Sequence, residues 1–219
     1  MIRVLIIDDQ TPGFIDEMKR DILGSFDRTE VTALHINPVE ELEKLPLNEF
    51  ISSIKTTASE FWDVVIIDIN LADVKQLKDD EKVQLPITIA QAFREKNHAA
   101  TAILYSGTLS DHIENLLSGD LPSEAALKRI FRAEIQAFCS RRIIKDEVLS
   151  ALDNPSWLLR IDRMLMKNRN LYVKPEEAKF KGRSFEVLAK SIRLQDREGQ
   201  EFVQLVTEYG VSNFIELNS

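Results

Sequence analysis

Residues 63–70 read Asp-Val-Val-Ile-Ile-Asp-Ile-Asn, and the prediction of the fold starts from these eight residues. The four residues 64–67 are all apolar and β-branched, so a strand built from them is apolar on both faces. Such a strand needs helices on both sides, which is typical of a parallel α/β sheet. Open sheets of this kind place their functional side chains at the carboxyl ends of the strands. The stretch therefore predicts that Asp68 stands at such an end.

The rest of the first 153 residues alternates strand and helix signals around this stretch. Alternation of this kind indicates right-handed βαβ crossovers and a parallel sheet. The predicted strands are 2–7, 30–36, 64–68, 102–105 and an irregular last strand from 137 that ends at Lys145. The predicted helices are 12–23, helical material up to 59 with a break at Pro46, 87–96, 110–117, 121–131 and one that begins at 147. Residues 72–86 are charged and are predicted to form an exposed loop.

Composition limits the classes of function. The 219 residues carry a formal charge of −8, which argues against broad nonspecific binding to nucleic acid or anionic lipid. The single cysteine, Cys139, rules out an internal disulfide and fits a reducing compartment. No apolar run is long enough to span a bilayer, and the N-terminus reads as a strand rather than a signal peptide. We expect a cytoplasmic protein without a membrane partner.

Polar side chains follow several of the apolar strands. Asp8 and Asp9 follow the first, Asp68 ends the third, and Ser106 follows the fourth. With the carbonyl of Asn70, three carboxylates form a hard-oxygen environment that suits Mg²⁺. A carboxylate can also attack phosphorus and form an acyl phosphate. A lysine and a hydroxyl, here Lys145 and Ser106, would hold the phosphoryl oxygens.

The chain resembles the receiver domain of the two-component response-regulator family over about residues 1–153. The matching segments are Ile6–Asp9, Ile67–Leu71, Tyr105–Gly107 and Ile144–Asp146. The resemblance implies a flavodoxin-like doubly wound parallel sheet of five strands in the order 2-1-3-4-5. It also implies a phosphorelay protein rather than an enzyme, with at most slow autodephosphorylation.

The resemblance implies roles for the matched residues. Asp68 is the phosphoacceptor, and its donor is a histidine kinase or a histidine phosphotransfer protein. Asp8, Asp9, Asp68 and the carbonyl of Asn70 hold Mg²⁺. Ser106 and Lys145 contact the phosphoryl group and relay its arrival.

The sequence departs from the family pattern at three points. Ala72 stands where a proline usually follows the phosphoacceptor, and Asp146 stands where a proline usually follows the lysine. Arg141 and Arg142 occupy the neighbourhood in which an aromatic residue usually precedes that lysine. Two segments are also long, the region before Asp63 and the region between Ser106 and Lys145. The domain is therefore expected to be an enlarged, atypical receiver.

Residues 154–219 form the output segment and are predicted to be helical. Apolar residues recur at helical spacing in three stretches, 157–166, 185–192 and 202–209. Three such helices make a small bundle or pair with a second copy of the chain, so we expect a protein-interaction or homodimerisation output. The alternative is a transcription factor with a divergent DNA-binding tail. Its support is the basic cluster formed by Lys174, Lys179, Lys181 and Arg183.

A second alternative is a Mg²⁺-dependent hydrolase that uses Asp68 as its nucleophile. Hydrolases of that class use an Asp-x-Asp spacing, and here Asn70 stands two residues after Asp68.

Overall fold

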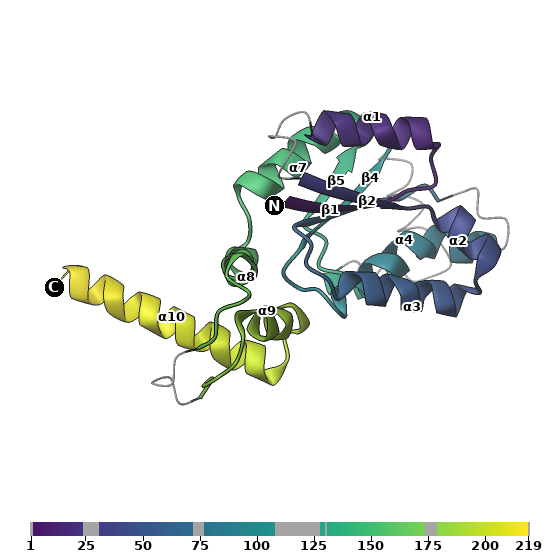
Figure 1. Ribbon diagram of the computed structural model, residues 1–219. Helices are drawn as coiled ribbons and strands as arrows, with labels where there is room; N and C mark the ends of the chain where they lie inside the picture. The colour runs from purple at the N-terminus through teal and green to yellow at the C-terminus, as the bar shows by residue number, and fades with distance from the viewer. Residues whose placement is uncertain are drawn as a thin grey trace. The chain divides into compact units, whose positions relative to one another are not determined.

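The computed structural model describes residues 2–23, 31–71, 77–107, 128–129, 131–173 and 179–218. The chain forms two compact units (Figure 1). The first comprises Met1–Glu95 and Ala100–Pro155, and the second comprises Lys96–Ala99 and Ser156–Ser219. The predicted helices 110–117 and 121–131 lie outside the described residues, apart from the last few positions of the second, and so does Ala72.

Five parallel strands form the sheet of the first unit. They are β1 (Ile2–Ile7), β2 (Val31–Ile36), β3 (Val64–Asp68), β4 (Thr101–Ser106) and β5 (Ala137–Ser140). Their order is β2-β1-β3-β4-β5, and each neighbouring pair is parallel. The predicted fold class and the order 2-1-3-4-5 are therefore confirmed.

Helices cover both faces of this sheet (Figure 1). On one face lie α1 (Pro12–Leu23) and α7 (Ile144–Asp153), which pack on side chains such as Val64 and Ile66. On the other lie α2 (Pro38–Lys44), α3 (Leu47–Ala58) and α4 (Asp79–Arg94), which pack on Val65 and Ile67. All four of these β3 side chains are fully buried. The apolar run 64–67 thus faces a core on each side, as its composition predicts.

A buried arginine ties α4 to the entries of the last two strands. Arg94 is 2% exposed. Its guanidinium donates to the carbonyls of Ala100 at 2.6 Å, Ala133 at 3.2 Å and Glu134 at 2.9 Å. It also donates to the side-chain oxygen of Gln136 at 2.6 Å. Four hydrogen bonds to two strand entries fix β5 at the edge of the sheet, and with it the segment that follows.

Two predicted boundaries are wrong. The last strand ends at Ser140 rather than at Lys145, and α7 begins at Ile144 rather than at 147. Ile144, Val148 and Leu152 are buried at a spacing of four residues, so residues 144–152 follow the period of a helix.

The predicted loop 72–86 is also wrong in its second half, because α4 begins at Asp79 and runs through Pro86. Its acidic start suits a helix N-terminus, where Glu81 accepts a hydrogen bond from the backbone N–H of Lys78 at 3.0 Å.

The described residues of the second unit form three helices, as predicted. They are α8 (Trp157–Lys167), α9 (Phe185–Leu194) and α10 (Arg197–Asn218). Their core includes an edge-to-face contact between Phe180 and Phe202, whose ring centroids lie 5.3 Å apart. No helix in the described part of the chain is long and apolar enough to cross a membrane.

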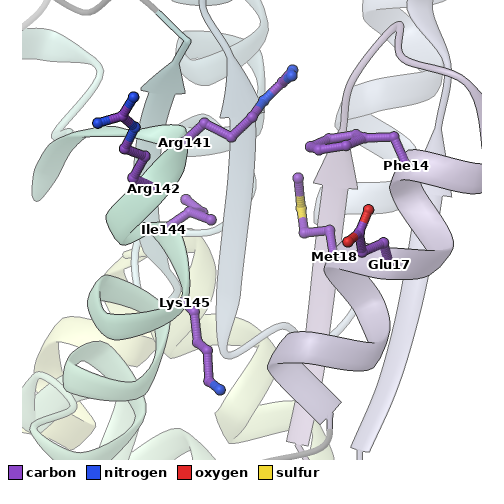
Figure 2. Close-up of a pocket in the computed structure, with 7 residues that line it drawn as sticks. All are labelled: Phe14, Glu17, Met18, Arg141, Arg142, Ile144 and Lys145. Carbon is purple, nitrogen blue, oxygen red and sulfur yellow. The ribbon is translucent and has the colours of Figure 1, made fainter.

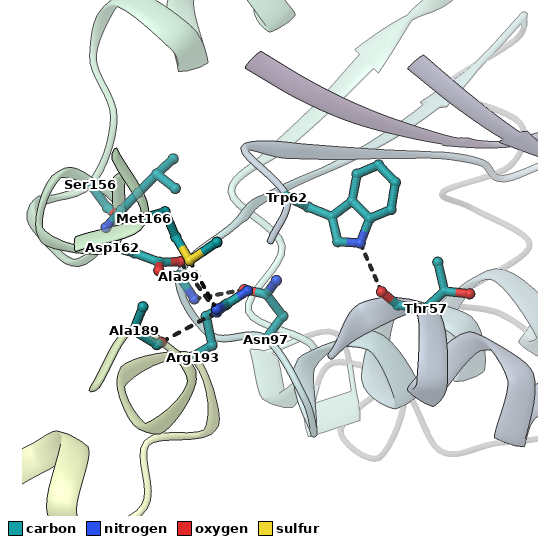
Figure 3. Close-up of polar contacts among 10 residues, drawn as sticks. Thr57, Trp62, Asn97, Ala99, Ser156, Asp162, Met166, Ala189 and Arg193 are labelled. Atoms are coloured by element: carbon teal, nitrogen blue, oxygen red, sulfur yellow. Dashed lines mark hydrogen bonds and ion pairs between the residues drawn. The ribbon is translucent and has the colours of Figure 1, made fainter. Parts of the chain in front are cut away.

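A buried ion pair joins α8 and α9 (Figure 3). Asp162 Oδ2 lies 3.5 Å from Nε of Arg193, and the two side chains are 0% and 5% exposed. The same Nε donates to the carbonyl of Ala189 at 3.2 Å. A charged pair placed this deep depends on both partners, because either one alone would be an uncompensated buried charge.

Candidate functional site

The carboxyl ends of β1 and β3 bring three aspartates together. Ile7 and Ile67 are partners in the register of these neighbouring strands, so Asp8 and Asp68 follow at the same edge of the sheet. One carboxylate oxygen from each of Asp8, Asp9 and Asp68 lies within 4.8 Å of the other two. Parallel pairing alone accounts for this convergence, because it aligns the strand ends that the sequence terminates with acids.

Asp8 is fully buried and only half satisfied. Its Oδ1 accepts a hydrogen bond from the backbone N–H of Gln10 at 2.6 Å. Its Oδ2 is buried and has no hydrogen-bond partner among the described residues. Burial is the main cause that raises the pKa of Asp8 above its usual value. An oxygen buried in this way needs a cation or a proton.

Asp68 is 1% exposed and shares this environment. Its Oδ1 accepts a hydrogen bond from the backbone N–H of Asn70 at 2.9 Å. Burial raises the pKa of Asp68 to about 7, and the charges of Asp8 and Asp9 add to the effect. The hydrogen bond from Asn70 and the charge of Arg141 act in the opposite direction. The ionised cluster is thus held at an electrostatic disadvantage in the bare protein.

These observations fit a hard divalent cation such as Mg²⁺. Three carboxylates converge, Asp8 Oδ2 is buried and has no hydrogen-bond partner in the part of the chain that the structure describes, and the mutual repulsion of the carboxylates favours a positive charge between them. Asn70, whose backbone carbonyl the sequence analysis adds to the ligand set, follows β3 at the same edge and is exposed.

Ser106 is the last residue of β4, the strand that lies beside β3. Tyr105 pairs with Asp68 in the register, so Ser106 lies one residue beyond the level of the predicted phosphoacceptor. The Ser106 side chain is fully buried. Its position at the same edge of the sheet agrees with a role beside Asp68.

Lys145 does not lie at the end of the last strand, where it was predicted. It is the second residue of α7, and its exposed side chain lines a groove between α1 and α7. The cation that the structure brings to Asp68 is Arg141, which directly follows β5. One terminal nitrogen of its guanidinium lies 4.0 Å from Asp68 Oδ2, and the guanidinium carbon lies 4.1 Å from the centre of the Phe14 ring.

Sequence reasoning missed Arg141 because it extended the last strand by five residues. Ser140 pairs with Ser106, so the strand that ends there places residue 141 at the level of the site. Phe138, an aromatic residue on β5, stands three positions before Arg141 and packs against the core cluster beneath α2, α3 and α4.

No protein-family model and no curated protein matches the chain. Among solved structures, a CheY-like response regulator from Mesorhizobium loti is 10% identical, with a TM-score of 0.38. The match covers 70% of this chain and 98% of that chain. RcsB from Salmonella enterica serovar Typhimurium, bound to promoter rprA in the presence of phosphomimetic BeF3−, is 15% identical, with a TM-score of 0.40 and coverage of 87% and 88%. Similarity at this level says nothing about reaction or partner.

Proposed function

We propose that the chain is a response regulator of a phosphorelay and that Asp68 accepts a phosphoryl group from a phosphohistidine. The donor is a histidine kinase or a histidine phosphotransfer protein. The observation that carries this proposal is the buried cluster of Asp8, Asp9 and Asp68 at the carboxyl edge of a five-stranded parallel sheet. Arg141, held beside Asp68 at 4.0 Å, adds the positive charge that a phosphoryl group requires.

Asp8, Asp9, Asp68 and the backbone carbonyl of Asn70 are the residues that would hold Mg²⁺. The ion supplies positive charge, which keeps the neighbouring carboxylates ionised and neutralises phosphoryl oxygens. Burial and the charges of Asp8 and Asp9 favour the protonated form of Asp68, whose pKa is raised to about 7. A protonated carboxyl group is a poor nucleophile, so the transfer is expected to depend on the bound cation.

Asp68, Arg141 and Ser106 have separate roles in the transfer. A carboxylate oxygen of Asp68 attacks the phosphorus, and the bond from phosphorus to the donor's ring nitrogen breaks as the acyl phosphate bond forms. The electron pair of the broken bond returns to the imidazole. Arg141 stabilises the charge of the transferred group, and the Ser106 hydroxyl donates a hydrogen bond to one of its oxygens. Later attack of water would release phosphate slowly, so the chain is a phosphoacceptor and not an enzyme.

The helical unit of residues 156–219 is the proposed output, through contact with a protein partner or a second copy of the chain. A DNA-binding output is a weaker candidate because two of the four cations in its basic cluster pair with carboxylates. Lys179 Nζ lies 3.4 Å from Glu201, and Arg183 Nε lies 2.6 Å from Glu198. Lys174 lies outside the described residues. Cations that already pair with carboxylates contribute less to phosphate contacts.

Intact mass after incubation with Mg²⁺ and acetyl phosphate tests the proposal. The wild type is expected to gain one phosphoryl group, and Asp68→Asn is expected to gain none. Arg141→Gln is expected to slow the gain about tenfold or more, and the matched cation change Lys145→Gln to leave it within about twofold. An equal effect of the two cation changes would show that Arg141 has no specific role in the transfer to Asp68. A phosphoryl group on Asp68→Asn would remove Asp68 as the acceptor.

A further inference from the structure

A groove of about 340 Å³ lies beside the acidic cluster, between α1 and the start of α7. It is lined by Phe14, Glu17 and Met18 of α1 and by Arg141, Arg142 and Lys145 across from them. Figure 2 shows these side chains on two facing elements, with Arg141 extended at one end and Lys145 directed toward the other. The groove therefore shares one residue, Arg141, with the proposed phosphorylation site.

The charge of the groove is opposite to that of the whole chain. Two cationic side chains, Arg141 and Lys145, and one carboxylate, Glu17, line it, in a protein with a formal charge of −8. Arg142 also belongs to the lining, but its side chain points away from α1 (Figure 2). Its walls also carry apolar side chains, because Phe14, Met18 and Ile144 contribute to the lining. A volume of this size lies near the lower end of the range of small-molecule sites. The lining therefore suits a small ligand with an anionic group and an apolar body.

Arg141 has hydrogen-bonding capacity left for such a ligand. Its Nε is buried and has no hydrogen-bond partner among the described residues. Its closest approach to Asp68 is 4.0 Å, which is an ion-pair distance too long for a hydrogen bond. The guanidinium is held over the Phe14 ring at 4.1 Å, an arrangement that orients it without using its N–H groups. An incoming anion can offer Arg141 the direct hydrogen bonds that Asp68 does not.

We infer that this groove binds a small amphipathic anion and that the anion competes with Asp68 for Arg141. The two sites are then linked by a shared cation, so each weakens the other by the same factor. Bound ligand lowers the reactivity of Asp68, and a phosphoryl group on Asp68 lowers the affinity for the ligand. This regulatory consequence rests on the proposed function of Asp68, whereas binding of the anion does not.

Methionine-methyl NMR of the full-length chain tests the inference, with naphthalene-1-sulfonate as the probe. This probe joins an anion to an apolar ring and has no phosphoryl group to transfer. Met18 lines the groove, and Met164 and Met166 of the second unit are internal references. We expect a saturable shift of the Met18 methyl with the references unchanged. The neutral analogue 1-naphthylmethanol is expected to bind about tenfold more weakly or worse, since it cannot pair with Arg141.

Variants separate the shared cation from a cation outside the groove. Arg141→Gln is expected to weaken the probe about tenfold, and the control Arg20→Gln, an exposed residue of α1 that does not line the groove, by no more than about threefold. Asp68→Asn removes the competing carboxylate, so the affinity is expected to rise severalfold. That rise should vanish in the double variant Asp68→Asn/Arg141→Gln, because a coupling that runs through Arg141 needs Arg141.

Three results would overturn the inference: no Met18 shift, equal binding of the neutral analogue, or no change of affinity in Asp68→Asn. Acetyl phosphate labelling of the same samples keeps the two proposals apart. Labelling without probe binding would refute anion binding in the groove and would leave the proposal that Asp68 is the phosphoacceptor intact. Probe binding that depends on Arg141, in a chain that takes no phosphoryl group, would refute the phosphoacceptor and leave the groove.

Discussion

The acidic cluster makes a quantitative prediction about stability. The pKa of Asp68 is about 7 in the folded chain, against 3.8 as the reference for the unfolded chain. At pH values between these two pKa values the folded state binds more protons than the unfolded state, so the free energy of unfolding falls as the pH rises through this window. A difference of about 3 pKa units corresponds to about 4 kcal/mol at 1.36 kcal/mol per unit. Above about pH 7 the loss is complete.

Asp68→Asn removes this loss of free energy of unfolding at high pH, because the amide cannot ionise. The variant is expected to match the wild type near pH 4 and to exceed its free energy of unfolding by about 4 kcal/mol at pH 8 without Mg²⁺. Saturating Mg²⁺ should stabilise the wild type more than the variant and narrow the gap, since the cation binds the folded state. The control is Asp63→Asn, which also replaces a buried aspartate. Asp63 accepts the Arg3 N–H at 2.7 Å and does not belong to the cluster of Asp8, Asp9 and Asp68.

Urea unfolding monitored by tryptophan fluorescence measures these differences. Trp62 is fully buried in the first unit, and Trp157 is 51% exposed in the second. A Trp157→Phe background therefore assigns the signal to the unit that holds the cluster. A gap between Asp68→Asn and wild type that stays constant from pH 5 to pH 8 would refute the electrostatic reasoning. So would a control variant Asp63→Asn with the same pH-dependent gain.

Three further predictions concern packing. Arg94→Met leaves strand-entry carbonyls without their donor, so urea unfolding is expected to show a loss of about 3–5 kcal/mol; a loss below about 1 kcal/mol would contradict its role. Gly199→Ala places a methyl group against the backbone of α9, and a loss of about 1–3 kcal/mol is expected, whereas the control Gly13→Ala meets open space and should not destabilise. Arg193→Met is expected to lower thermal stability sharply, and the added change Asp162→Leu should restore part of it; no recovery in the double variant would refute a buried charge penalty.

The sheet could be predicted because its signals are local. The run 64–67 is apolar at every position, and this pattern needs a core on both sides wherever the chain goes. The acids of the site follow directly from the strands, so their convergence required only parallel pairing. The end of the last strand could not be predicted from local sequence signals of this kind. The sequence Ile143-Ile144-Lys145 suits either a strand end or a helix start, and the choice depends on whether Ile144 and Val148 find the same core.

The choice between Lys145 and Arg141 shows why a strand boundary decides the chemistry of a site. Asp8 and Asp9 follow β1, Asp68 ends β3, Ser106 ends β4, and Arg141 follows β5. Adjacent strands lie about 4.8 Å apart, so β3 and β5 are separated by about 10 Å with β4 between them. Only a long side chain that begins at the level of the strand ends reaches Asp68 across that distance. Arg141 meets both conditions, whereas Lys145 begins a full helical turn later. In the proposed function, a group bound to Asp68 would thus have Ser106 on the neighbouring strand and Arg141 beyond it.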